Sequence, residues 1–110
     1  MANFEHRLGL AFAALADPTR RRLLDQLAHE GTRNASQLAQ SYTISRQAIV
    51  KHLGALCDAG VLHAQRHGNE VRYSVDRAAL DEASTWLAEV GHRWDSRLVA
   101  LGKRLESKRP

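Results

Sequence analysis

The sequence has a single cysteine, Cys57, and only two prolines among its 110 residues. One cysteine excludes any disulfide bond within the chain and fits the reducing cytoplasm. No apolar run approaches the roughly 20 residues that cross a membrane, and the N-terminal stretch MANFEHRLG lacks the features of a signal peptide. We therefore expect a cytoplasmic protein with no membrane partner.

Motifs of the common enzyme classes are also missing. The sequence has no phosphate-binding glycine loop, no nucleophile elbow and no credible triad of metal ligands. Ser45 and His52 lie about two turns apart on one expected helix, so their side chains are beyond hydrogen-bond reach. These absences argue against an enzyme, and we expect no cofactor and no bound metal ion.

Basic residues are in moderate excess. The chain carries 16 Lys and Arg residues against 12 Asp and Glu, a formal net charge of +4, which favours an anionic partner without identifying one. With 44% hydrophobic and 25% charged residues, the composition is that of a globular protein. The length suffices for one core but not two, so we expect a single domain over residues 1–110.

Two helices are expected at the N-terminal end. The first covers residues 5–15, where apolar side chains recur at helical spacing. This stripe consists of Phe4, Leu8, Phe12 and Leu15. Asp17 then serves as N-cap, and Pro18 takes the first position of a second helix that ends at Gly31.

The stretch from Ser45 to Gly60 predicts a helix with two different faces. Ser45 is a suitable N-cap, and Gly60 suits the left-handed position after the end. One side is mostly apolar and faces the core: Ala48, Ile49, His52, Leu53 and Leu56. The other side is short-chained, polar and cationic: Arg46, Gln47, Val50, Lys51 and Gly54. Such a face fits a DNA major groove, and a short helix expected over residues 35–40 completes a helix-turn-helix over residues 35–59.

After Gly60 the hydrophobic period changes to that of β-strands. Residues 62–67 and 70–75 are two extended segments joined by Gly68-Asn69, which is a hairpin signal. A basic hairpin at this place is typical of a wing, expected over residues 62–75. Its polar side chains are placed to reach phosphates or a minor groove: Arg66, His67, Asn69 and Arg72. The alternative is a solvated hairpin that carries some charge.

The last element is a long helix, expected over residues 78–105. Its apolar residues form a nearly heptad pattern: Leu80, Ala83, Leu87, Val90, Trp94, Leu98, Leu101 and Leu105. A small domain cannot bury this whole stripe, and the first helix has the same surplus. Pairing both helices across a two-fold axis gives a homodimer. The expected interface residues are Phe4, Leu8, Phe12, Leu87, Val90, Trp94, Leu98 and Leu101.

The fold class that follows is mainly α with a small β-hairpin wing, in the order α-α-α-α-β-β-α. Four segments carry a family resemblance: ALADPTRRRLLDQL (14–27), SQLAQ (36–40), SRQAIVKHLGALCDAGVL (45–62) and RHGNEVRYSV (66–75). Through them, over residues 5–105, the chain resembles the ArsR/SmtB family of winged helix-turn-helix repressors. The resemblance implies a dimeric, DNA-binding transcriptional repressor, usually released from its operator by an inducer.

The sequence departs from this family at the metal sites. Metal-sensing members carry a cysteine pair in the helix before the recognition helix, in a pattern like ELCVCDL. This chain has TRNASQL there, with Asn34 and Ser36 at the thiol positions, and neither is a ligand for a soft metal. In the last helix His92 and Asp95 share a face, but a third ligand is missing. The sequence thus predicts no metal site of the family type.

Four further features allow a structural and a functional interpretation. His52 is expected to be a packed histidine that bonds a backbone carbonyl or a phosphate, rather than a pH or metal switch. Cys57 has no second cysteine to pair with and lies at a helix C-terminus, which disfavours the thiolate that a redox sensor needs. Arg20–Arg22 point in three directions on a helix, so mostly structural roles are expected. Trp86 is expected to pack against the first helix.

The leading hypothesis is a sequence-specific transcriptional regulator, a homodimeric repressor of an inverted-repeat operator. The side chains expected to contact double-stranded DNA are Ser45, Arg46, Gln47, Val50 and Lys51 from the helix, with Arg66, Asn69 and Arg72 from the wing. Arg46 and Gln47 are the expected base readers, because Arg favours guanine and Gln favours adenine. Two alternatives stay open: a winged-helix protein-interaction module that does not bind DNA, and a metal- or thiol-responsive sensor.

Overall fold

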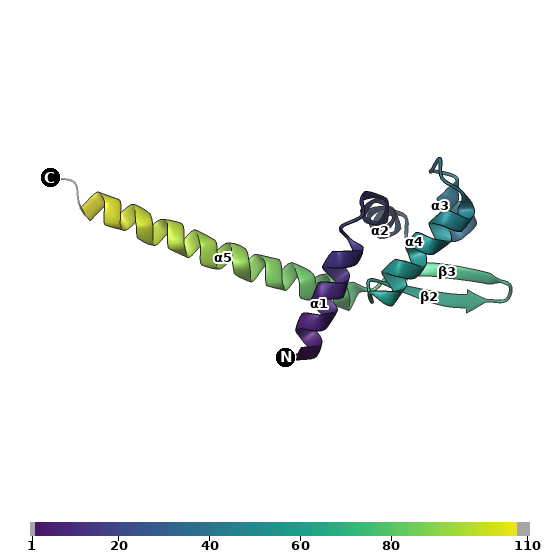
Figure 1. The fold of residues 1–110 in the computed structure, drawn as a ribbon, viewed down its shortest axis with the longest axis horizontal. Helices are drawn as coiled ribbons and strands as arrows, with labels where there is room; N and C mark the ends of the chain where they lie inside the picture. The colour runs from purple at the N-terminus through teal and green to yellow at the C-terminus, as the bar shows by residue number, and fades with distance from the viewer. Residues whose placement is uncertain (1, 108–110) are drawn as a thin grey trace.

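The structure, a computed structural model, describes residues 2–107, which form five helices and three strands (Figure 1). In chain order these are α1 Ala2–Ala14, α2 Pro18–Glu30, β1 Arg33–Asn34, α3 Ala35–Ala39, α4 Arg46–Asp58, β2 Leu62–His67, β3 Glu70–Val75 and α5 Arg77–Ser107. This order confirms the winged helix-turn-helix fold, with one strand more than the sequence predicted. None of the helices in the described range combines the length and the apolar character that crossing a membrane requires.

Short-range signals set most of the helix ends. Asp17 caps α2 and Ser45 caps α4, each by accepting a hydrogen bond from the backbone amide three residues later. Gly31 and Gly60 follow the ends of α2 and α4 with φ angles of 84° and 77°, a backbone conformation that glycine adopts without a steric penalty. These four boundary residues confirm the sequence prediction.

The short helix α3 has a cap that the sequence analysis missed. The Oδ1 atom of Asn34 accepts a hydrogen bond from the Gln37 amide at 2.8 Å, and the Oε1 atom of Gln37 accepts one from the Asn34 amide at 2.9 Å. This reciprocal pair is a capping box built from Asn and Gln instead of the commoner Ser or Thr and Glu. It starts α3 at Ala35 as expected, and the helix ends at Ala39, one residue earlier than predicted.

The outer helices are longer than predicted. α1 covers Ala2–Ala14 instead of residues 5–15, because neither proline nor glycine precedes Phe4 to prevent an early start. α5 covers Arg77–Ser107 instead of residues 78–105. Its start is fixed by Asp76, whose carboxylate accepts a hydrogen bond from the Ala79 amide at 3.0 Å.

The sheet has three antiparallel strands in the order β1-β3-β2. β2 and β3 form the expected hairpin, and Gly68 adopts a φ of 62° at its turn. β1 was not predicted, because a strand of two residues has no periodic pattern. It pairs Arg33 with Tyr73 and Asn34 with Arg72, and so ties the start of α3 to the wing.

The core lies where α2, α3, α4 and the base of the wing meet. Its largest fully buried side chains are Leu23, Leu38, Ile49, Leu53, Leu56 and Val61. Leu24 of α2 is half-buried at the edge of this core. Because the apolar side of α4 is buried here, its polar side is turned outward, as an amphipathic helix on a small core requires.

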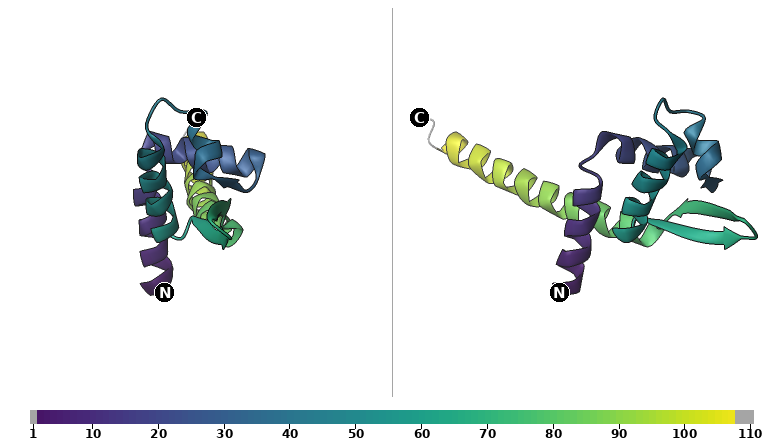
Figure 2. Two further views of the ribbon diagram at one scale, coloured as in Figure 1. Left: turned by 90° about the vertical axis from the view of Figure 1, so that its right-hand side faces the viewer. Right: turned by 45° about the vertical axis from the view of Figure 1, so that its right-hand side comes forward.

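α5 extends away from this core, in the direction opposite to the wing (Figures 1 and 2). Its 31 residues span about 46 Å at the rise of an α-helix. The radius of gyration is 19.4 Å, whereas a compact domain of this length would have about 13 Å. Since α1 crosses only the first part of α5 (Figure 2), no other element within residues 2–107 lies beside the remainder of α5.

Candidate nucleic-acid interface

The two faces of the recognition helix α4 differ in burial: its apolar side faces the core and its polar side faces the solvent. Ile49, Leu53 and Leu56 have no solvent-exposed surface. The opposite side is exposed over the side chains of Arg46, Gln47, Val50 and Lys51, which the sequence assigned to DNA contacts. The structure therefore brings these four together on one surface, next to the capping residue Ser45.

A side chain from α3 holds the first arginine of this surface. The Nε atom of Arg46 donates a hydrogen bond to the Ser36 hydroxyl oxygen, 2.9 Å away. From the sequence, Ser36 was expected only to stand at the position of a metal-binding thiol. Its contact with Arg46 joins residues on two helices, and no local pattern in the sequence indicates it.

The three predicted DNA-contacting side chains of the wing differ in whether they are free or already paired. Arg66 and Asn69 are exposed near the tip. Arg72 is already engaged, because its Nε and Nη2 atoms donate to the Glu70 carboxylate at 3.2 and 3.1 Å. Within residues 2–107 no hydrogen bond or ion pair holds Arg66 or Lys51, so these two cations are available to an external anion.

Glu70 is an acidic residue at the start of β3, and it was not among the residues expected from the sequence to have a role. Its second oxygen accepts a hydrogen bond from the Asn34 side-chain amide. The hydrogen bonds from Asn34 and then from Arg72 hold the pKa of Glu70 below its usual value. A charged Glu70 thus links Arg72 on the wing to the residue that caps α3.

The helix-turn-helix and the wing enclose a hollow of about 350 Å³. Arg46 and Val50 line it from α4, Ser36 lines it from α3, and Asn69 and Glu70 line it from the wing. The predicted contact residues therefore divide into two groups. Arg46, Val50 and Asn69 converge on the hollow, whereas the other predicted contacts do not line it: Ser45, Gln47, Lys51, Arg66 and Arg72.

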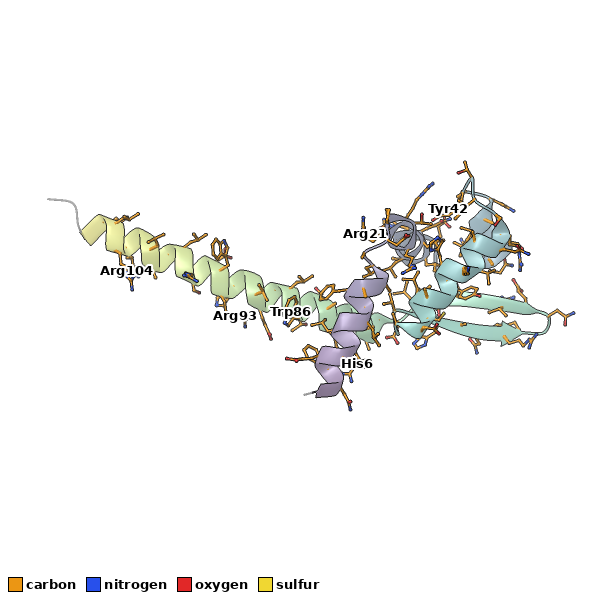
Figure 3. The ribbon with its side chains drawn as sticks, in the orientation of Figure 1. His6, Arg21, Tyr42, Trp86, Arg93 and Arg104 are labelled. Carbon is orange, nitrogen blue, oxygen red and sulfur yellow. The ribbon has the colours of Figure 1, made fainter. Side chains whose placement is uncertain are left out.

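The basic run at the start of α2 has structural partners, as expected. Arg21 donates to the carbonyl oxygens of Leu15 and Ala16 at 2.7 and 3.0 Å, near the junction of α1 and α2 (Figure 3). Arg22 donates to the Ser41 carbonyl at 3.1 Å and lies 4.5 Å from the ring centre of Tyr42. These bonds satisfy carbonyl groups at helix ends and hold the link between α3 and α4.

The first of these arginines bonds His52. The Nε atom of Arg20 donates to Nδ1 of His52 at 3.3 Å, and the Asp17 carboxylate lies 3.9 Å from the same nitrogen. His52 is thus packed against side chains at the start of α2, and the structure shows these in place of the backbone carbonyl that was expected as its partner.

The far part of α5 exposes a continuous apolar face, which we call the α5 seam. It consists of Leu87, Val90, Trp94, Leu98, Leu101 and Leu105, each between 38% and 60% exposed. Val99 is also exposed, at 59%, although the sequence analysis did not include it. Arg93 and Arg104 lie on the same projecting part of the helix, beyond Trp86 (Figure 3). Large apolar surfaces of this kind on a small protein mark interaction sites.

The apolar stripe of α1 is used mainly within the chain. Leu8 is 9% exposed, and the Phe12 ring lies 5.6 Å from the Trp86 ring, which confirms the expected packing of Trp86 on the first helix. Phe4 is half-buried. These three residues of α1 were predicted to face a partner, but packing against their own chain already covers much of their surface.

The former thiol positions do not fit a soft metal ion. The Asn34 amide is committed to the capping box and to Glu70, and the Ser36 hydroxyl accepts the bond from Arg46. Among residues 2–107, no three His, Cys, Asp or Glu side chains lie close enough together to hold a metal ion. Burial, followed by the nearby Asp58 carboxylate, raises the pKa of the Cys57 thiol, which makes its thiolate scarce.

Comparisons with known proteins agree with this geometry. Residues 15–64 match the model of a helix-turn-helix domain family. The transcriptional repressor SdpR of Bacillus subtilis is 33% identical over 87 residues, which cover 79% of this chain and 96% of that protein. The similarity therefore covers almost the whole length of this relative and extends beyond the helix-turn-helix.

Two solved structures share the fold. An ArsR-like transcriptional regulator from Rhodococcus sp. RHA1 has a TM-score of 0.75 and 39% identity, covering 88% of this chain and 91% of that chain. The homodimeric winged helix-turn-helix DNA-binding domain of a Mycobacterium bovis protein has a TM-score of 0.63 and 26% identity, with coverages of 88% and 86%. The similarity includes the arrangement of the helices as well as the sequence.

Proposed function

Because the chain belongs to the ArsR/SmtB family of winged helix-turn-helix transcriptional regulators, we propose that it is a homodimeric repressor of an inverted-repeat DNA operator. The observation that carries this proposal is the division of α4, whose apolar side is fully buried while its cationic side is exposed beside a wing. A helix of this kind presents hydrogen-bond donors to base edges in the major groove.

The residues of α4 have separate roles in this proposal. Arg46 and Gln47 near the helix N-terminus read bases, since Arg pairs with guanine and Gln with adenine. Val50, 37% exposed, offers an apolar contact to a thymine methyl group. Ser45 and Lys51 contact phosphates, where a hydroxyl group or an ammonium group serves without regard to sequence.

The wing holds the DNA backbone. Arg66 and Asn69 are exposed near its tip, where they reach phosphates or a minor groove. Arg72 contributes less charge than Arg66, because the Glu70 carboxylate neutralises much of it. Arg66 is therefore expected to be the stronger phosphate contact of the two.

The α5 seam supplies the dimer contact. Its residues project beyond the rest of the chain, and a second copy placed across a two-fold axis covers both seams at once. The homodimeric state of the Mycobacterium bovis relative supports this arrangement. A dimer presents two recognition helices to two half-sites, which explains why the operator is an inverted repeat.

Mobility shift of DNA from the promoter that precedes the protein's own gene tests the proposal. We expect a specific complex whose affinity falls steeply with salt, since phosphate contacts release counterions. We also expect the same affinity with added zinc and with a chelator, because Asn34 and Ser36 replace the family's thiols. Specific binding that zinc abolishes contradicts the metal-independent part, and absence of specific binding favours the protein-interaction module.

A further inference from the structure

Two arginines on the DNA-facing surface are held by their Nε atoms, but by different groups. Arg46 donates from Nε to the neutral hydroxyl oxygen of Ser36 at 2.9 Å. Arg72 donates from Nε and Nη2 to the charged carboxylate of Glu70. The carboxylate neutralises Arg72, whereas the hydroxyl group leaves the full positive charge on Arg46.

The Ser36 contact also determines which atoms of Arg46 remain. A guanidinium group has five N–H donors, one on Nε and two on each terminal nitrogen. With Nε bonded to Ser36, the side-on pair formed by Nε and Nη2 is no longer free. The end-on pair of donors, formed by Nη1 and Nη2, stays free. These two parallel donors match the O6 and N7 acceptors of guanine.

The surroundings of Arg46 support this orientation. Ser36, Arg46 and Val50 line the same hollow between α3, α4 and the wing. Ser36 stands on a helix whose start is fixed by the capping box of Asn34 and Gln37. A long, flexible arginine held at Nε by such a rigid element loses less conformational freedom when it binds a base.

We propose that Ser36 is a positioning residue for sequence readout, which holds Arg46 so that its two terminal nitrogens face one guanine. This inference rests on the proposed DNA-binding function and names guanine as the base that Arg46 reads. Ser36 acts through Arg46 and touches no base itself. Its loss therefore weakens discrimination between base pairs without changing the sequence-independent affinity.

The test measures binding of the full chain to short duplexes in which every base pair of the bound promoter site is varied in turn. Arg46→Ala first identifies the base pair at which discrimination is lost. Ser36→Ala is then expected to lower discrimination at that same base pair by about 3- to 10-fold, the size of one hydrogen bond. Ser36→Thr keeps the hydroxyl group and is expected to retain the discrimination, and Ser84→Ala on α5 is a matched control with no effect.

Two further readouts separate positioning from a structural role. We expect Ser36→Ala to keep the melting temperature and the affinity for unrelated DNA, and to have no further effect in the Arg46→Ala background. Unchanged discrimination in Ser36→Ala, or an equal loss on all sequences, overturns the positioning role while the repressor function stands. An Arg46→Ala variant that discriminates normally also overturns it. If the wild-type chain binds no specific DNA, the proposed function fails as well.

Discussion

The two ends of the molecule differ in how much of their packing one chain supplies. At the DNA-facing end, Leu53 is fully buried, and Arg46 and Arg72 have partners in the same chain. Along the free part of α5, Trp94 and Leu98 are 58% and 47% exposed. The proposed DNA-contacting surface is thus packed within one chain. In the proposed function its placement on two half-sites depends on a second copy, so we expect folding and operator binding to respond to different substitutions.

The largest effect is expected from substitutions in the α5 seam, which should weaken the dimer but leave the core at the other end of the molecule folded. Leu98→Glu combined with Leu101→Glu places four carboxylates in the proposed dimer contact, because each substitution occurs twice. Full burial of a leucine contributes about 1.5–3 kcal/mol. Leu98 and Leu101 are 47% and 51% exposed in one chain, so covering the four side chains contributes about 3–6 kcal/mol, and we expect a dimer weaker by more than about 100-fold. Analytical ultracentrifugation and operator binding measure this loss.

A matched substitution on α5 controls for added charge. Ser96 is exposed and lies away from the seam, so Ser96→Glu is expected to leave the dimer intact. The far-ultraviolet circular dichroism of the double variant is expected to show a folded core. A double variant that stays dimeric shows that another surface joins the two copies.

The next largest effect concerns the core of the DNA-facing end. Leu53→Ala removes a side chain with no exposed surface, and we expect a loss of about 2–5 kcal/mol in the free energy of unfolding. Because this core belongs to one chain, the loss is expected to be the same at all protein concentrations. Urea unfolding over a range of concentrations measures it.

Urea unfolding of an α5 variant over the same range of protein concentrations tests whether α5, unlike the core, depends on a second copy. Leu98→Ala acts on the dimer, so its effect on unfolding is expected to shrink as the protein is diluted below its dimerisation constant. If Leu53→Ala shows this concentration dependence and Leu98→Ala does not, the assignment of the two regions is reversed.

The sequence predicted the features that depend on neighbouring residues. The caps Asp17 and Ser45 and the turn at Gly68 each act within one turn of chain, and the structure confirms all three. The two faces of α4 followed from helical periodicity alone. The five helices, the two strands of the wing and their order could therefore be predicted from the sequence, whereas the two-residue strand β1 could not.

Contacts between distant residues were not accessible in this way. Asn34 and Glu70 are 36 positions apart, and Ser36 and Arg46 are 10 positions apart on separate helices. Periodicity also shows which residues share an apolar face but not what covers it. For this reason Leu8 was assigned to the dimer interface, although packing within its own chain already leaves it only 9% exposed.

A smaller effect is expected from the acidic residue on the DNA-facing surface. Glu70→Gln keeps an oxygen for Asn34 but removes the charge that neutralises Arg72. We expect stronger binding to unrelated DNA by a few-fold at low salt, and a salt dependence steeper by about one phosphate contact. Titration of a random duplex at several salt concentrations measures both.

An acidic residue on α5 provides the control for Glu70. Glu89→Gln removes an exposed charge far from the wing and is expected to change neither quantity beyond a small long-range effect. Weaker binding of Glu70→Gln to every sequence means that the bonds of Glu70 to Asn34 and Arg72 matter more for the shape of the wing than for its charge.

The smallest expected effect is a pH dependence at the start of α2. The amide hydrogen bond from Arg20 is the main cause that holds the pKa of Asp17 below its ordinary value of 3.8. Since the folded chain binds a proton there less readily than the unfolded chain, Asp17 stabilises the fold fully above that value. This contribution is lost as the pH falls through the lowered pKa.

Asp17→Asn isolates that contribution, because asparagine caps a helix about as well as aspartate but does not titrate in this range. At neutral pH the wild type is expected to melt at a higher temperature than the variant, and the difference is expected to close as the pH falls below 3.8, the ordinary pKa of the group. Ser45→Asn exchanges one uncharged cap for another on α4, so its difference from the wild type is expected to stay constant. A difference for Asp17→Asn that widens in acid would show that the aspartate destabilises α2, and the acid sensitivity would then belong to another carboxyl group of the chain.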